Sequence, residues 1–137
     1  MTNIHGGAVL ELTYPVQRFI EDNITLIEEN ELSLFFYSSL FSLTNQHSEE
    51  LFKVFTDVLN INPEPAIKAA LVEWCEDNVA LGIRKKVGVS QLLKNIPKFG
   101  YDSLKFRWMF IDAVKTAYPN KTVLPDSYGI EYIVEKD

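Results

Sequence analysis

The sequence has one cysteine and two histidines among its 137 residues, which leaves little material for disulfides or metal sites. Cys75 has no second cysteine with which to form an internal disulfide, as is typical of proteins in a reducing compartment. His5 and His47 lie far apart and match none of the usual spacings of zinc ligands. We therefore expect a disulfide-free protein that binds neither a metal nor another cofactor.

The motifs of catalysis are also missing. The six glycines are scattered and form neither a phosphate-binding loop nor a glycine-flanked nucleophilic serine. Cys75 follows Trp74 in a helical pattern, so we expect a small buried side chain. The nearby carboxylates of Glu73, Glu76 and Asp77 would raise the pKa of its thiol rather than activate it. The sequence therefore indicates a protein that is not an enzyme.

Long apolar runs are absent as well. No stretch approaches the roughly 20 apolar residues that a membrane-spanning helix needs, and no basic segment followed by an apolar run opens the chain. The content of hydrophobic residues, 47%, and of aromatic residues, 12%, argues against disorder. A chain of this length can bury one sizeable core. We expect a single helical domain over residues 1–137, soluble and cytoplasmic.

Residues 102–118 predict the central element of the fold, a helix that is apolar on most of its circumference. Asp102 or Ser103 is expected to cap its first turn, and Pro119 to end it. Its apolar residues follow helical spacing on two sides: Leu104, Trp108, Ile111 and Tyr118 on one, and Phe106, Phe110, Ala113 and Ala117 on the other. This leaves a narrow polar strip of Lys105, Met109, Asp112 and Thr116. A helix that is apolar nearly all round is usually buried, so we expect the side chain of Trp108 in the core.

Other segments also have helical patterns. They cover residues 15–28 with an interruption at Asp22-Asn23, residues 31–44, residues 48–59 capped by Ser48, residues 63–82 or 63–86 capped by Asn62, and a short helix capped by Ser90. In the second of these, three serines are expected to allow close packing: Ser38, Ser39 and Ser42. The fold class that we predict is mainly α, a compact single-domain bundle of five or six helices around the buried helix at about 102–118.

Alternating apolar and polar residues predict short strands near both ends of the chain. One covers residues 8–14, and the other, with the clearer alternation, covers residues 128–134. The intervening residues 118–127 are rich in turn formers. Because a lone strand leaves its backbone groups unpaired, we expect the two terminal strands to pair with each other.

The charges are distributed unevenly along the chain, whose net charge is −6. Residues 1–79 carry 13 acidic residues against three basic ones, a balance of −10, and residues 80–137 have a balance of +4. The acidic residues of the first helices form the candidate protein-binding face: Glu21, Asp22, Glu28, Glu29 and Glu31. Such a face steers the association of a basic protein. Small immunity proteins and phage-encoded inhibitors are similar in size and charge, without a shared motif. We expect a non-catalytic regulator, inhibitor or neutraliser of a protein partner.

The basic segment 84–107 supports an alternative function in nucleic-acid binding. Its candidate contacts to nucleic acid are Arg84, Lys85, Lys86, Lys94, Lys98, Lys105 and Arg107. A short helix followed by a turn and a longer helix is compatible with a helix-turn-helix-like arrangement. The second helix is nevertheless mostly apolar, and base readout requires polar side chains. The same residues could instead contact phosphates alone, or only solvent.

Overall fold

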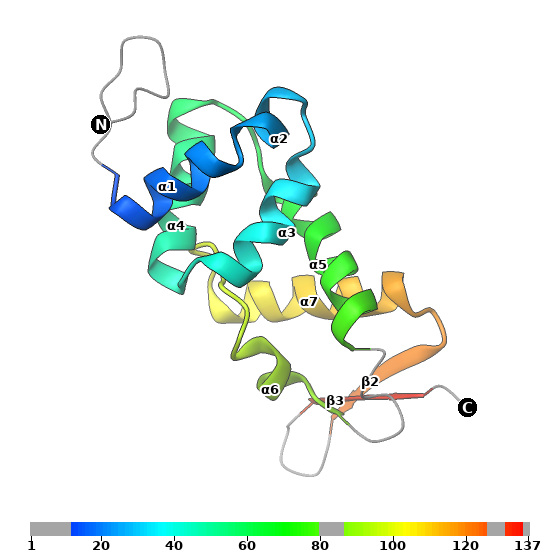
Figure 1. Cartoon of the computed structure of the whole chain (residues 1–137). Helices are drawn as coiled ribbons and strands as arrows, with labels where there is room; N and C mark the ends of the chain where they lie inside the picture. Colours follow the sequence, from blue (N-terminus) through cyan, green and yellow to red (C-terminus); the bar gives the residue numbers. More distant parts are fainter. Residues whose placement is uncertain (1–11, 80–86, 126–130, 136–137) are drawn as a thin grey trace.

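The computed structural model describes residues 12–79, 87–125 and 131–135, and the structural statements below concern these residues. They form a mainly helical domain with a small C-terminal antiparallel sheet (Figure 1). The helices are α1 (Tyr14–Asp22), α2 (Ile24–Glu28), α3 (Leu32–Ser42), α4 (Asn45–Lys53), α5 (Glu64–Asn78), α6 (Val89–Leu93) and α7 (Ser103–Ala117). Five of these described helices have nine residues or more. The predicted fold class is confirmed.

The predicted interruption at Asn23 separates α1 from α2. Its backbone N–H donates to the carbonyls of Phe19 and Ile20, at 3.1 and 3.2 Å, and its side-chain amide donates to the Phe19 carbonyl at 2.9 Å. Asn23 thus satisfies carbonyls that α1 leaves without partners at its end. At the other end of α1, the Glu50 carboxylate accepts from the backbone N–H of Thr13 at 2.8 Å and from its hydroxyl at 2.6 Å. These two bonds fix the start of α1 against α4.

Helix α4 begins earlier than predicted. Thr44 is its cap, because the Thr44 hydroxyl accepts from the backbone N–H of His47 at 3.3 Å. Ser48, predicted as the cap, lies fully buried inside the helix. Its hydroxyl donates to the Asn45 carbonyl at 2.9 Å and accepts from the backbone N–H of Phe99 at 3.2 Å. Ser48 therefore joins α4 to the segment that precedes α7.

The ends of the next two helices also differ from the predictions. Helix α4 continues into a π-helical turn, η1 (Val54–Val58). Asn62 accepts from the backbone N–H of Glu64 at 3.2 Å, as a capping side chain would, but α5 ends at Asn78. The predicted extension beyond residue 79 lies outside the described residues. Helix α6 begins at Val89, directly after Gly88, so Ser90 is not its cap.

The core is built around aromatic rings from helices that are distant in sequence. Phe35 and Phe36 of α3 are fully buried and contact Phe55, with ring centroids 5.5 and 5.0 Å apart. Phe36 also contacts Phe99, at 5.7 Å. Helix α5 packs against both α3 and α7 and connects the N-terminal helices to the C-terminal part of the domain (Figure 1).

Helix α7 has the predicted Asp102 cap, which accepts from the backbone N–H groups of Leu104 and Lys105, both at 3.0 Å. The predicted burial of the side chains of α7 is partly wrong. Trp108, expected in the core, is 54% exposed, and Leu104 is exposed too. Met109, assigned to the polar strip, is buried. The reason is that α7 packs mainly on α5 and on β2. On the predicted apolar side of Leu104, Trp108 and Ile111, only Ile111 is buried.

The sheet has three strands in the order β1-β3-β2, and all its pairs are antiparallel. They are β1 (Val87–Gly88), β2 (Lys121–Pro125) and β3 (Glu131–Glu135). The C-terminal strand is confirmed over β3, and residues 128–130 of the prediction lie outside the described residues. The described neighbours of β3 are β1 and β2, and the predicted N-terminal partner is described only in part. Of residues 8–14, those up to 11 lie outside the described residues, Leu12 and Thr13 are not in a strand, and Tyr14 begins α1. Strand β3 pairs with β1 and, over its full length, with β2, which lies in a segment predicted to be turns.

Candidate protein-binding surface

The large exposed apolar side chains of the described residues fall into two groups. Four belong to the first three helices: Tyr14, Ile24, Leu34 and Phe41. Three belong to the C-terminal part: Leu104, Trp108 and Leu124. Single exposed apolar residues are normal on protein surfaces, whereas grouped ones can mark interaction sites. The first group and the predicted acidic residues belong to the same stretch of chain, residues 14–41, and the two sets together are called the apolar–acidic surface below.

A groove separates α1 from α3 within this surface. Its volume is about 560 Å³, and its lining residues are Tyr14, Pro15, Arg18, Phe19, Asp22, Asn23, Ser38 and Ser42. The buried ring of Phe19 contacts that of Phe35 on α3, with centroids 5.0 Å apart. Helix α1 otherwise packs on α4. The predicted acids pointed to this face, but sequence analysis did not assign Tyr14, Arg18, Ser38 or Ser42 to a site.

The serines of α3 serve two different purposes. Ser39 is fully buried and donates its hydroxyl to the Phe36 carbonyl at 2.6 Å, as the predicted close packing requires. Ser38 and Ser42 instead line the groove, where their small side chains keep it open. The Ser42 hydroxyl donates back to the Ser38 carbonyl at 3.1 Å.

The outer side of α3 presents Phe41, which is 61% exposed. Its ring lies edge-on to that of Tyr37, with centroids 5.2 Å apart. The Tyr37 hydroxyl donates to the Asp77 carboxylate on α5. Burial, followed by the interaction with Asp77, raises the pKa of Tyr37 to about 12. Tyr37 is therefore held in place and supports one side of the Phe41 ring, while Phe35 and Phe36 of the same helix face the core.

All five acidic residues of the predicted face are exposed: Glu21, Asp22, Glu28, Glu29 and Glu31. Asp22 forms an ion pair with Arg18 at 3.2 Å, and Glu21 accepts from the side-chain amide of Gln17 at 3.3 Å. The other three lie on α2 or between α2 and α3. The sequence contains no lysine or arginine between Arg18 and Lys53. The apolar–acidic surface is therefore negative, with Arg18 as its one basic residue among residues 12–52.

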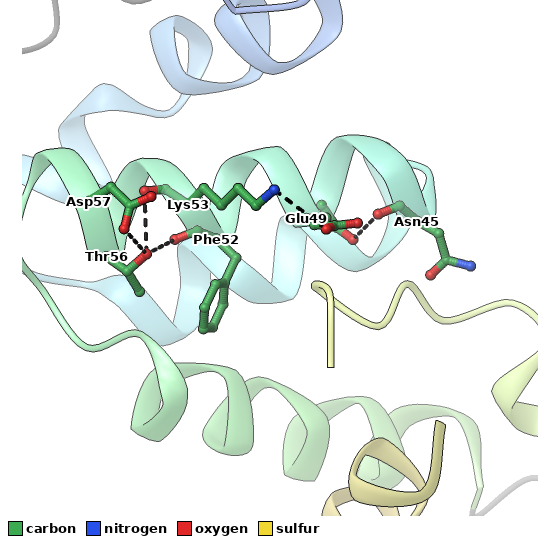
Figure 2. Close-up of polar contacts among 7 residues, drawn as sticks. Asn45, Glu49, Phe52, Lys53, Thr56 and Asp57 are labelled. Atoms are coloured by element: carbon green, nitrogen blue, oxygen red, sulfur yellow. Dashed lines mark hydrogen bonds and ion pairs between the residues drawn. The ribbon is translucent and has the colours of Figure 1, made fainter. Parts of the chain in front are cut away.

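A second hollow lies between α4–η1 and residues 99–101. Its volume is about 340 Å³, and it is lined by Glu49, Phe52, Lys53, Thr56, Asp57, Phe99, Gly100 and Tyr101. Figure 2 shows that its polar side chains contact one another. Lys53 pairs with Glu49 at 3.6 Å, and the Thr56 hydroxyl is 3.2 Å from both the Phe52 carbonyl and the Asp57 carboxylate. All three contacts lie within α4 and η1, so none of them crosses the hollow.

Of the four described basic residues of the alternative function, three have polar partners. Arg84, Lys85 and Lys86 lie outside the described residues. The Lys98 ammonium donates to the Ser103 hydroxyl at 2.9 Å. The Lys105 ammonium lies 3.1 Å from the Glu64 carboxylate, and this bond lowers the pKa of Glu64.

Arg107 is engaged as well, since it pairs with Glu131 at 2.8 Å and donates to the Ser90 hydroxyl at 3.2 Å. Lys94 is exposed. Residues 94–102 separate α6 from α7, whereas a helix-turn-helix has a turn of about three or four residues. The predicted helix-turn-helix-like arrangement therefore does not match the connection between these helices.

The buried thiol behaves as the sequence predicts. Cys75 is fully buried, and its pKa is raised to about 12, mainly by burial and further by Glu76. Within residues 12–79, 87–125 and 131–135, no group of three or more His, Cys, Asp or Glu side chains is placed to hold a metal ion. None of the described helices combines the length and apolar character that crossing a membrane requires.

Comparison with known proteins adds no residue roles. The chain matches no protein-family model, no curated protein and no solved structure. The function of the protein is therefore inferred from the chemistry of its described surface.

Proposed function

We propose that this domain binds a protein partner through the apolar–acidic surface and performs no catalysis itself. The observation that carries the proposal is that residues 14–41 expose both large apolar side chains and acidic ones. Binding energy at protein interfaces is concentrated in a few large side chains, and Phe41 and Tyr14 are the candidates here. The surrounding acids favour a partner with a basic surface, because complementary charge accelerates association.

The proposal can be tested by capturing partners from a lysate of the source organism and identifying them. Each captured protein is then purified and titrated calorimetrically against the wild type and two variants, Phe41→Ser and the double variant Glu28→Lys, Glu29→Lys. We expect each variant to weaken binding at least about tenfold, as the loss of an interface anchor or of steering charge does. Binding should also weaken as the salt concentration rises.

Matched controls come from the opposite group of exposed residues. Leu104→Ser removes an exposed apolar side chain of α7, and Asp112→Lys reverses an exposed charge there. Both variants should bind like the wild type. A partner whose affinity is unchanged by the α2 and α3 variants, or equally reduced by the α7 variants, would refute the proposed surface.

Nucleic-acid binding remains a second candidate because of one observation, the exposed indole of Trp108. An exposed aromatic ring is a platform on which an unpaired base can stack. The ion pairs of Lys105 and Arg107 with carboxylates oppose this function. A titration of labelled single-stranded RNA and duplex DNA across a salt series tests it. Micromolar binding that weakens steeply with salt and is lost in Trp108→Ala would support it, and no binding at low salt would exclude it.

A further inference from the structure

We infer that the partner presents a basic segment with one large apolar side chain, and that this side chain enters the groove between α1 and α3. The inference rests on the proposed function and adds the chemistry of the partner and the place where it binds. It follows from the shape of the groove, the composition of its walls and the position of the acids.

The shape of the groove suits a side chain rather than a whole domain. Its lining residues run from Tyr14 to Asn23, the full length of α1. Helical residues rise by about 1.5 Å each, so the groove extends along roughly 13–15 Å. Its volume of about 560 Å³ lies in the range of roughly 300–1,000 Å³ that holds small ligands. A single aromatic or large aliphatic side chain with its adjoining backbone fits these dimensions.

The walls combine apolar surface around Tyr14 with polar side chains elsewhere, and the part around Tyr14 is the one that suits an apolar guest. Phe19 and Pro15 contribute apolar surface on the α1 side, and Tyr14 stands beside them with 70% of its surface exposed. On the α3 side the wall consists of Ser38 and Ser42. Because these hydroxyl-bearing side chains are small, they leave the space between the helices unfilled. An apolar side chain placed there would bury both its own surface and that of the exposed aromatic ring, which is favourable.

The positions of the acidic residues indicate the charge of the partner's segment and its orientation along the groove. Asp22 lines the groove at the C-terminal end of α1, and the chain then continues directly into Glu28, Glu29 and Glu31. The Arg18–Asp22 ion pair lies on the surface, with side chains 61% and 57% exposed, and such pairs are weak. A partner's cation can therefore compete for Asp22. The basic residues of the partner should lie toward α2, and its apolar residue toward Tyr14.

Four synthetic peptides test this inference by titration into the ¹⁵N-labelled protein. The first is Lys-Lys-Ala-Phe-Ala-Lys-Lys; the others replace its phenylalanine by alanine, its lysines by glutamate, or both. We expect the first peptide to shift the backbone amide signals of Arg18, Asn23, Ser38 and Ser42. Replacing its phenylalanine or its lysines should weaken binding at least about tenfold, because each change removes either the apolar side chain for the groove or the positive charges for the acids.

A pair of tryptophan variants separates the groove from the rest of the surface. Ser42→Trp fills the groove from the last residue of α3, at an exposed position. Thr116→Trp is its control, since this exposed residue near the end of α7 lines a different hollow, between α5 and α7. Only Ser42→Trp should weaken binding of the first peptide. Circular dichroism of both variants verifies that they are folded.

The outcomes distinguish this inference from the proposed function. If the peptides bind equally with phenylalanine or alanine, and Ser42→Trp has no effect, the groove is not the site and the inference is wrong. The proposed function would still stand if the Glu28→Lys, Glu29→Lys variant lost its captured partner. The absence of any amide shift at millimolar concentrations of the first peptide would also overturn the inference.

Discussion

The two neighbouring aromatic residues of α7 should differ sharply in their contribution to stability. Phe110 is fully buried, and its ring contacts that of Trp74 with centroids 5.8 Å apart. Replacing it by alanine should cost about 3–5 kcal/mol of unfolding free energy, the usual range for a buried aromatic. Trp108 keeps 54% of its surface exposed. Trp108→Ala should therefore cost roughly half as much, about 1.5–2.5 kcal/mol.

Urea unfolding followed by circular dichroism measures this difference without relying on tryptophan fluorescence. With a typical denaturant slope of about 1–3 kcal/mol per M, a gap of about 2 kcal/mol separates the two midpoints by roughly 1 M. Phe110→Leu serves as a milder variant if the alanine variant is too unstable to purify. Equal costs for the two alanine variants, or a larger cost for Trp108→Ala, would show that the orientation of α7 described above is wrong.

Three further predictions concern single contacts. Gly100→Ala should destabilise the folded state by about 1–2 kcal/mol, because Gly100 has a φ of +85° and an added Cβ would lie 2.9 Å from the Glu49 Cγ. The same change in a Glu49→Ala background separates backbone strain from this contact, with urea unfolding as the measurement for both. Glu50→Ala should cost about 1–3 kcal/mol by removing the acceptor for Thr13, with a thermal unfolding curve as the measurement. The native Cys75 thiol should resist a thiol reagent at pH 8 and react fully in urea, since its pKa is raised to about 12; rapid reaction of the native protein would contradict its burial.

Local signals in the sequence predicted much of the helical architecture. Asn23 and Asp102 mark helix boundaries, because their side chains bond to backbone groups within a few residues, and such interactions depend little on the remainder of the fold. The sequence does not predict which side of α3 is buried, and so does not predict the burial of Phe35 and Phe36. Their helix carries apolar residues on several sides, and only the positions of the neighbouring helices decide which side faces the core.

The failures have a common cause in tertiary contacts. Ser48 looked like a cap, but its partner is the backbone of Phe99, 51 residues away. Strand β2 contains Pro125 and follows a turn, so its sequence does not predict a strand. Its pairing with β3 is what makes it one. The acidic face was predicted correctly as exposed, whereas the groove beside it could not be predicted. A groove depends on how far apart two helices lie, and the sequence of neither helix contains that distance.

The strand order of the sheet has a consequence for the sequence of folding events during synthesis. The middle strand, β3, comes after both of its neighbours in the chain, and Val87 pairs with Ile133 across 46 residues. On a ribosome, the helices up to α7 can pack before either ladder exists, since contacts that are local in sequence form first. Strand β1 then remains unpaired until β3 has emerged from the ribosome. A nascent chain that ends before Glu131 would retain the apolar–acidic surface while lacking the whole sheet.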